Sequence, residues 1–114
     1  MSECIFCKIA AGEIPSTKVY EDEYVLAFED LNPQMPVHVL IVPKKHYRNI
    51  GDGIPDNEMG YLFNAVKKIA DIKGITDSGY RVIVNTGDDA QQTVHHVHIH
   101  VLGGAQMTFE NMRA

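Results

Sequence analysis

Short apolar, β-branched stretches bounded by Gly, Pro, Asn or Asp recur along this chain and predict β-strands. They cover residues 17–20, 24–29, 37–42, 80–86 and 93–104. The acidic run 21–23 separates the first two and predicts a hairpin. One long stretch has helical spacing instead. It is expected to begin at Asp56 as the N-cap and to end near Lys73, just before Gly74.

The long helical stretch repeats its apolar residues every 3.6 positions, which predicts one buried face. That face consists of Met59, Leu62, Phe63, Val66, Ile69 and Ala70. A shorter helix is expected over residues 3–11, with Ser2 as its cap and Gly12 as its stop. Helices that stand apart from hairpin-joined strands predict an α+β fold with an antiparallel sheet.

Length and charge narrow the class of protein. A chain of 114 residues is long enough for one domain, residues 1–114, and a modest core. The net charge is −5 with acids and bases dispersed, which disfavours a nucleic-acid binder. No apolar run approaches membrane-spanning length, and the start lacks signal-peptide features. We therefore expect a soluble cytoplasmic protein that contacts no membrane.

The last predicted strand contains four of the six histidines of the chain. Alternation along a strand places His96, His98 and His100 on one face and the apolar residues between them on the other. His95 has the parity of the apolar face. Packing gains nothing from three imidazoles in a row, whereas imidazole suits proton transfer, nucleophilic attack and metal binding. The pattern therefore indicates a functional site on the face of the sheet that carries the three histidines.

The segment from His96 to Leu102 has the form His-φ-His-φ-His-φ-φ, where φ is apolar, and it resembles the signature of the histidine triad superfamily. Three further blocks look like its Hint branch of nucleoside phosphoramidases and nucleotide-binding proteins: CIFCKIAAGEIPS, LAFEDLNPQMPVHVLIVPKKH and VNTGDDAQQTVHHVHIHVLGGAQM. The resemblance implies a HIT-like fold with a five-stranded antiparallel sheet, one long helix and one short helix. It also implies a homodimer whose two sheets join.

The resemblance assigns the catalytic roles. His98 matches the nucleophile that forms a covalent nucleotidyl-histidine, and His100 matches the histidine that binds the α-phosphate or assists proton transfer. His38 matches a supporting histidine on the adjacent strand. The implied activity is hydrolysis or nucleotidyl transfer at the α-phosphorus of purine nucleoside phosphoramidates, as in an adenosine 5′-monophosphoramidase, without a catalytic metal.

Three alternatives stay open at this point. The chain could hydrolyse dinucleoside polyphosphates or nucleotidyl anhydrides. It could bind nucleotides as an adaptor with vestigial catalysis. Its three same-face histidines could instead form a His₃ metal centre for hydrolysis.

The resemblance also maps a nucleotide site. Asn85 and Thr93 match the phosphate contacts, Val94 adjoins them, and Asp30 matches the carboxylate that accepts the ribose hydroxyls. The base pocket maps onto Ile5, Phe6, Ile9, Ile14, Phe28 and Leu31. Gln91 departs from the pattern, because the Hint branch usually has glycine there. The C-terminal residues 108–114 also differ from the family ending, so no tail-dependent specificity is carried over.

Cys4 and Cys7 lie three residues apart, so both thiols share one face of the short helix. Two thiolates and two imidazoles make a tetrahedral Cys₂His₂ zinc site. The resemblance supplies His46 and His96 as the two imidazoles and implies a structural zinc ion. Reduced free thiols remain the alternative, and His95 is an alternative fourth ligand.

Overall fold

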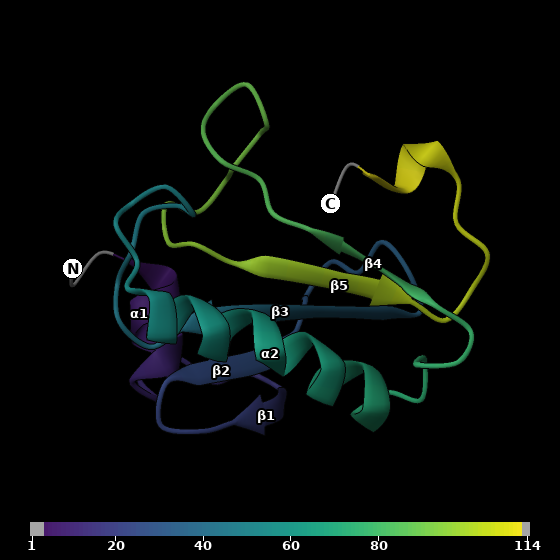
Figure 1. Ribbon diagram of the computed structural model, residues 1–114, viewed down its shortest axis with the longest axis horizontal. Helices are drawn as coiled ribbons and strands as arrows, with labels where there is room; N and C mark the ends of the chain where they lie inside the picture. The colour runs from purple at the N-terminus through teal and green to yellow at the C-terminus, as the bar shows by residue number, and fades with distance from the viewer. Residues whose placement is uncertain (1–3, 113–114) are drawn as a thin grey trace.

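A single antiparallel sheet of five strands organises the protein, whose computed structural model describes residues 4–112. The strands lie in the order β1-β2-β3-β5-β4 (Figure 1). Their bounds are β1 Lys18–Glu21, β2 Val25–Glu29, β3 Val37–Pro43, β4 Tyr80–Ile83 and β5 Ile99–Gly103. The helices are α1 Ile5–Ala10, α2 Asp56–Ile72 and the short 3₁₀ helix η1 Phe109–Met112. The α+β fold with one long and one short α-helix is thus confirmed.

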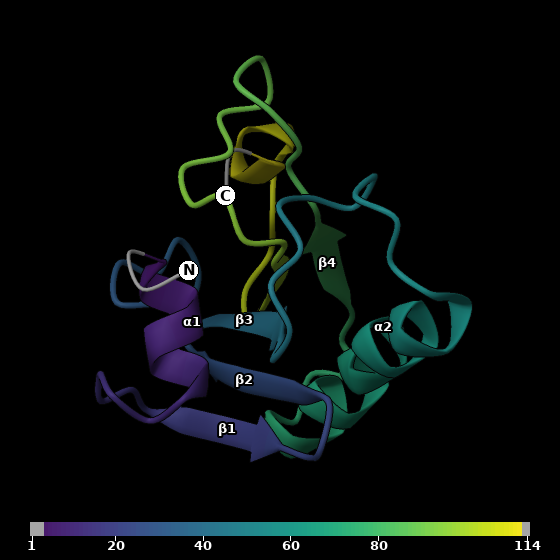
Figure 2. The same cartoon turned by 90° about the vertical axis from the view of Figure 1, so that its left-hand side faces the viewer.

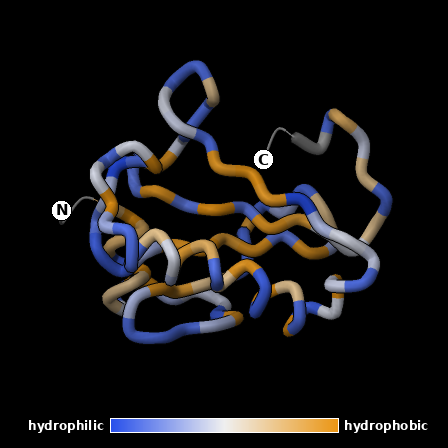
Figure 3. The backbone as a smooth tube through the Cα atoms, in the orientation of Figure 1, coloured by the Kyte–Doolittle hydropathy of each residue, from blue (hydrophilic) through white to orange (hydrophobic). Residues whose placement is uncertain are grey.

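The two α-helices cover opposite faces of the sheet, as Figure 2 shows. Alternation along β2 divides its side chains between them. Val25 and Ala27 join the core under α2, whereas Leu26 and Phe28 join a smaller core with α1. Figure 3 shows the hydrophobic strands at the centre and hydrophilic connecting loops around them. None of the helices in residues 4–112 is long and apolar enough to cross a membrane.

Helix α2 begins at Asp56 itself, so the prediction that this residue is the N-cap is wrong. Pro55 occupies the cap position and makes no side-chain hydrogen bond there, while Asp56 and Glu58 in the first turn complement the helix dipole. The prediction that Phe63 is buried is also wrong, because its side chain is 36% exposed. Phe63 lies on the flank of a face centred on Leu62 and Ile69, and it therefore faces solvent.

Helix α1 is shorter than predicted, because Cys4 is its N-cap and its Sγ accepts a hydrogen bond from the Cys7 N–H at 3.3 Å. Ser2, the expected cap, lies outside the described residues. Gly12 follows the helix with a φ of 79°, which a residue with a side chain rarely adopts and which suits its predicted role as the stop.

Candidate active site and metal centre

The histidine segment is only partly a strand. Strand β5 begins at Ile99, and residues 94–96 form a bend, so the expectation of one strand over residues 93–104 is wrong. The bend takes His95 out of the alternation, and its side chain is exposed instead of facing the apolar core. His96, His98 and His100 share the α1 side of the sheet, but they are 0–6% exposed and do not line an open surface.

Helix α1 places one aromatic ring over His98 and His96. The Phe6 ring meets the His98 ring edge-on, with centroids 5.1 Å apart, and lies 6.0 Å from that of His96. Burial disfavours the charged imidazolium and lowers the pKa of His98 below its usual value. It also lowers the pKa of His96 to about 4 and that of His100 to about 3. All three imidazoles are therefore neutral at pH 7.

Hydrogen bonds to backbone carbonyls fix the tautomers of two of these rings. His98 Nδ1 lies 2.8 Å from the carbonyl oxygen of His96, and His96 Nε2 lies 2.8 Å from that of Pro43. A carbonyl oxygen only accepts, so both ring nitrogens must carry their proton and donate it. In the neutral rings, the unprotonated nitrogens are therefore His98 Nε2 and His96 Nδ1.

A second chain of hydrogen bonds orients His100. The Gln34 N–H donates to His38 Nδ1 at 3.0 Å, so neutral His38 carries its proton on Nε2. That Nε2 donates to His100 Nδ1 at 2.9 Å, which leaves the His100 proton on its own Nε2. Burial lowers the pKa of His38, although the Asp30 carboxylate, 3.4 Å from its Nε2, acts in the opposite direction.

His98 and His100 both line a cavity of about 250 Å³ between α1 and the sheet. It contains most of the residues predicted for nucleotide binding: Ile5, Phe6, Ile9, Ile14, Phe28, Asp30, Leu31, Thr93 and Val94. Leu31 is 97% exposed, so it stands at the rim instead of in an apolar pocket. Asn85 is absent from the residues that line this cavity. The cavity has the size of a nucleobase, and its wall is largely apolar with a few polar side chains. These features suit a small organic ligand.

The loop before the histidine segment depends on Gln92, a residue that the sequence analysis missed. Its side chain is 6% exposed, accepts from the Gly87 N–H at 2.9 Å and donates to the carbonyls of Arg48 and Val94 at 2.7 and 3.0 Å. The adjacent Gln91 has a φ of 62°, in the left-handed region that favours glycine. This backbone conformation accounts physically for the glycine expected at that position.

The four predicted metal ligands converge. The ligand atoms of Cys4, Cys7, His46 and His96 all lie within 4.8 Å of one another. Their S···N separations are 3.3 Å for Cys4–His96, 3.3 Å for Cys7–His46 and 3.5 Å for Cys7–His96. Tetrahedral zinc with ordinary bond lengths requires S···N distances of about 3.6 Å. Because the His96 lone pair is already on Nδ1, this donor set fits zinc; His95 is not part of it.

The alternative His₃ centre does not form from the described residues, because His96, His98 and His100 do not bring three ligand atoms within 4.8 Å of one another. Asp30, His38 and His100 do so. A metal on His38 Nε2 would, however, displace the proton that the Gln34 N–H keeps there. This second group is therefore better described as a hydrogen-bonded network.

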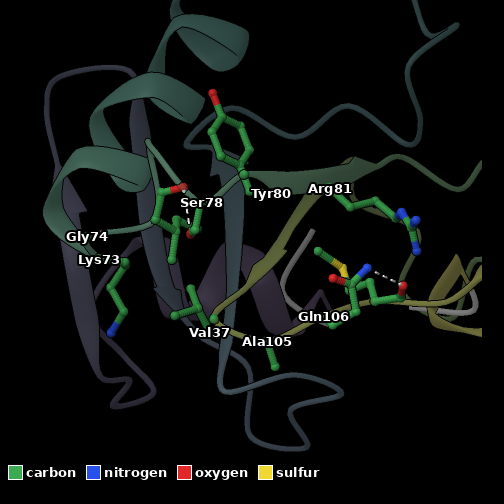
Figure 4. Close-up of a pocket in the computed structure, with 12 residues that line it drawn as sticks. Val37, Lys73, Gly74, Ser78, Tyr80, Arg81, Ala105 and Gln106 are labelled. Carbon is green, nitrogen blue, oxygen red and sulfur yellow. Dashed lines mark hydrogen bonds between the residues drawn. The ribbon is translucent and has the colours of Figure 1, made fainter.

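A larger cavity, about 660 Å³, is lined by the connection between α2 and β4, the start of β4 and the segment after β5 (Figure 4). Its two charged side chains are already engaged within the protein: Lys73 with Glu29 at 2.5 Å, and Arg81 with the Thr108 carbonyl at 2.7 Å. No histidine or cysteine lines it. The candidate catalytic and metal-ligating residues lie instead around α1.

Comparison with known proteins places this arrangement in a family. The family model described as the HIT domain matches residues 11–107. The chain belongs to the HIT domain family. It is 46% identical over 117 residues to the 14 kDa zinc-binding protein of Zea mays, an alignment that covers 95% of this chain and 87% of that one.

Solved structures of HIT proteins share the fold over nearly the whole chain. A histidine triad protein from Clostridium difficile is 54% identical with a TM-score of 0.89, covering 95% of this chain and 96% of that one. A HIT family hydrolase from Legionella pneumophila is 45% identical with a TM-score of 0.88, covering 94% and 97%. The histidine triad nucleotide-binding protein of Candida albicans is 34% identical with a TM-score of 0.83, covering 96% and 90%.

Proposed function

We propose that this HIT protein is a nucleotide hydrolase that cleaves purine nucleoside phosphoramidates at the α-phosphorus through a covalent nucleotidyl-histidine. One observation carries the proposal: His98 is held as the tautomer whose Nε2 is a free nucleophile, by its 2.8 Å hydrogen bond to the His96 carbonyl. The names of the similar hydrolase and nucleotide-binding proteins support the reaction class and the ligand class.

In the proposed reaction, the His98 Nε2 lone pair forms a bond to phosphorus as the P–N bond breaks. The electron pair of the P–N bond stays on the departing amine, which takes a proton from water. Positive charge on the His98 ring is stabilised by its Nδ1–H donating to the His96 carbonyl. The His100 Nε2–H donates to a phosphate oxygen, because His38 occupies its other nitrogen. Water then hydrolyses the His98–phosphorus bond and restores the enzyme.

The same proposal assigns the nucleoside to the 250 Å³ cavity. The base lies against Phe6 and Phe28, and Asp30 accepts hydrogen bonds from the ribose. Asp30 Oδ1 already accepts from the Asn32 N–H at 2.8 Å, which holds the carboxylate in place. Thr93 at the cavity wall offers its hydroxyl to the phosphate.

We further propose a structural zinc ion at Cys4, Cys7, His46 and His96. The convergence of the four ligand atoms and the name of the maize zinc-binding relative support it. Bound there, zinc would supply a crosslink between α1 and the segment that carries His98. The His96 side chain would hold the ion while its carbonyl orients the nucleophile.

We also propose a homodimer in which β4 pairs with its copy. The two edge strands of the sheet differ in a way that supports this choice. Edge strand β1 carries the exposed Lys18–Glu21 ion pair, a feature that discourages pairing. Edge strand β4 instead exposes Tyr80 and Val82, at 36% and 38%. Mass measurement by light scattering tests the dimer, and Val82→Lys is expected to shift it towards monomer.

The test of the reaction is mass spectrometry of the intact protein after brief mixing with adenosine 5′-phosphoramidate. An alkaline denaturing quench is needed, because acid cleaves phosphohistidine. We expect a transient adenylate adduct in the wild type and none in His98→Ala, while Lys67→Ala, at an exposed position of α2 on the other face of the sheet, is the control and keeps the adduct. AMP release without any adduct would contradict covalent catalysis, and nucleotide binding without turnover would favour the adaptor alternative.

A further inference from the structure

A second hollow adjoins the candidate active site and is not used by the nucleoside. It has a volume of about 440 Å³, and three residues, Ile5, Thr93 and Val94, line both it and the cavity that contains His98. The two hollows therefore meet along these residues, at the position where the phosphate is proposed to bind. The rest of its wall consists of Arg48 and His95, together with Cys4 and His46 of the proposed zinc site.

The guanidinium of Arg48 has no acidic partner in this hollow. Among residues 4–112, no carboxylate lies within 4.0 Å of it, although five lysines of the chain do form ion pairs. The backbone of Arg48 is nevertheless fixed on both sides. Its N–H donates to Asp52 Oδ2 at 2.8 Å, and its carbonyl accepts from Gln92 Nε2 at 2.7 Å. A permanently charged side chain thus projects from an anchored backbone.

His95 lies on the same wall and gives the second polar group. Its imidazole is exposed at the bend of residues 94–96 and is not part of the group of metal ligands. Among the described residues, no carboxylate lies within 4.0 Å of this ring. The protein as a whole has a net charge of −5. This hollow differs from that overall charge, because it carries an arginine and an imidazole beside the proposed phosphate site.

We propose that this hollow is the leaving-group subsite, and that Arg48 makes it select leaving groups that carry a carboxylate or a phosphate. The inference rests on the proposed function and specifies its substrate. In-line displacement puts the leaving group on the side of phosphorus opposite His98 Nε2, outside the nucleoside cavity. The adjoining hollow is the space next to Thr93 that can receive it, and an anion there meets a guanidinium without displacing an existing ion pair.

Two substrates that differ only in charge isolate this effect. The adenosine 5′-phosphoramidates of glycine and of glycinamide have the same size, but only the first carries a carboxylate. We expect a higher kcat/KM for the glycine compound, and we expect Arg48→Gln to reduce the glycine-to-glycinamide ratio about fivefold, as for a partly exposed ion pair. Arg48→Lys should recover part of the ratio, because it keeps the charge but loses the planar fork.

Lys67→Gln is the matched control for the loss of one positive charge. Lys67 lies on α2, across the sheet from both hollows, and is 80% exposed. Its substitution should leave the substrate ratio unchanged. Raising the ionic strength from 0.05 to 0.5 M should lower the wild-type ratio, since exposed charges are screened. An equal ratio in wild type and Arg48→Gln overturns the assignment of Arg48.

A binding measurement distinguishes a phosphate from a carboxylate and separates failure of the subsite from failure of the proposed function. In the His98→Ala background, calorimetry compares ADP with AMP, which lacks the second phosphate. Adding Arg48→Gln should reduce the ADP-to-AMP affinity ratio about fivefold. If neither glycine compound turns over, the proposed reaction fails, and the ADP-to-AMP ratio still decides whether Arg48 recognises an anion. An unchanged affinity ratio with a reduced glycine ratio restricts the subsite to carboxylates.

Discussion

Replacement of the buried His100 should change how stability depends on pH. Its side chain is 6% exposed, and burial lowers its pKa from 6.5 to about 3. Between these pH values, the unfolded chain therefore binds a proton on His100 that the folded protein does not bind. The contribution of neutral His100 to the free energy of unfolding is fully present above pH 6.5, and it decreases as the pH falls through this window. Between pH 8 and pH 5 the loss due to His100 alone is about 2 kcal/mol.

The variant His100→Gln should consequently lose less stability on acidification than the wild type. The assay is urea unfolding followed by circular dichroism at pH 8, 7, 6 and 5. The free energy of unfolding is plotted against pH for each protein, and the slopes of the two plots are compared. Comparing slopes removes the constant cost of losing the 2.9 Å contact with His38. His95→Gln, which removes an exposed histidine from the same segment, is the control for the substitution itself. Parallel curves for His100→Gln and the wild type would refute the account of a neutral, buried imidazole.

Further predictions concern the loop, the metal centre and two glycines. Gln91→Gly should raise the melting temperature and stability by up to about 1 kcal/mol, because the φ of 62° disfavours a side chain. Cys7→Ser should abolish stoichiometric zinc measured by atomic absorption and lower thermal stability, since a ligand of the Cys₂His₂ set is lost. Gly103→Ala should destabilise by about 1–3 kcal/mol in thermal melts, because the new Cβ would lie 2.8 Å from Ile75 Cδ1. Gly60→Ala, in the α2 interior with no atom within 4 Å of the new Cβ, should instead stabilise by up to about 1 kcal/mol.

Strong local patterns account for the parts of the fold that could be predicted. The apolar strands β2 and β3 and the spacing in α2 follow directly from the sequence, because burial of one face imposes a period. The strand boundaries were harder to predict from the sequence. Strand β4 ends at Ile83 and β5 begins at Ile99, since residues 84–98 are held by tertiary contacts such as those of Gln92. Gln92 makes hydrogen bonds with three backbone groups, and no periodic pattern in the sequence predicts such a residue.

The candidate catalytic and metal-ligating residues were predicted from a motif, but their arrangement required the structure. Periodicity placed His96, His98 and His100 on one side of the sheet. It could not reveal that Phe6 from α1 covers His96 and His98. Leu31 was expected in the base pocket, yet its position in the loop after β2 leaves it exposed. Loop side chains depend on the local path of the chain, which the residue types alone do not specify.

His96 explains why the metal centre and the candidate active site occur together. Its Nδ1 faces the two cysteines, its Nε2–H donates to the Pro43 carbonyl of β3, and its own carbonyl fixes the His98 tautomer. A metal ion bound to Nδ1 would therefore hold the same residue that orients the proposed nucleophile, His98. Cys4 and Cys7 flank Phe6, which packs on His98, so α1 makes a second connection between the two sites. A metal ion at the proposed centre would accordingly affect the geometry of His98 without taking part in the proposed reaction.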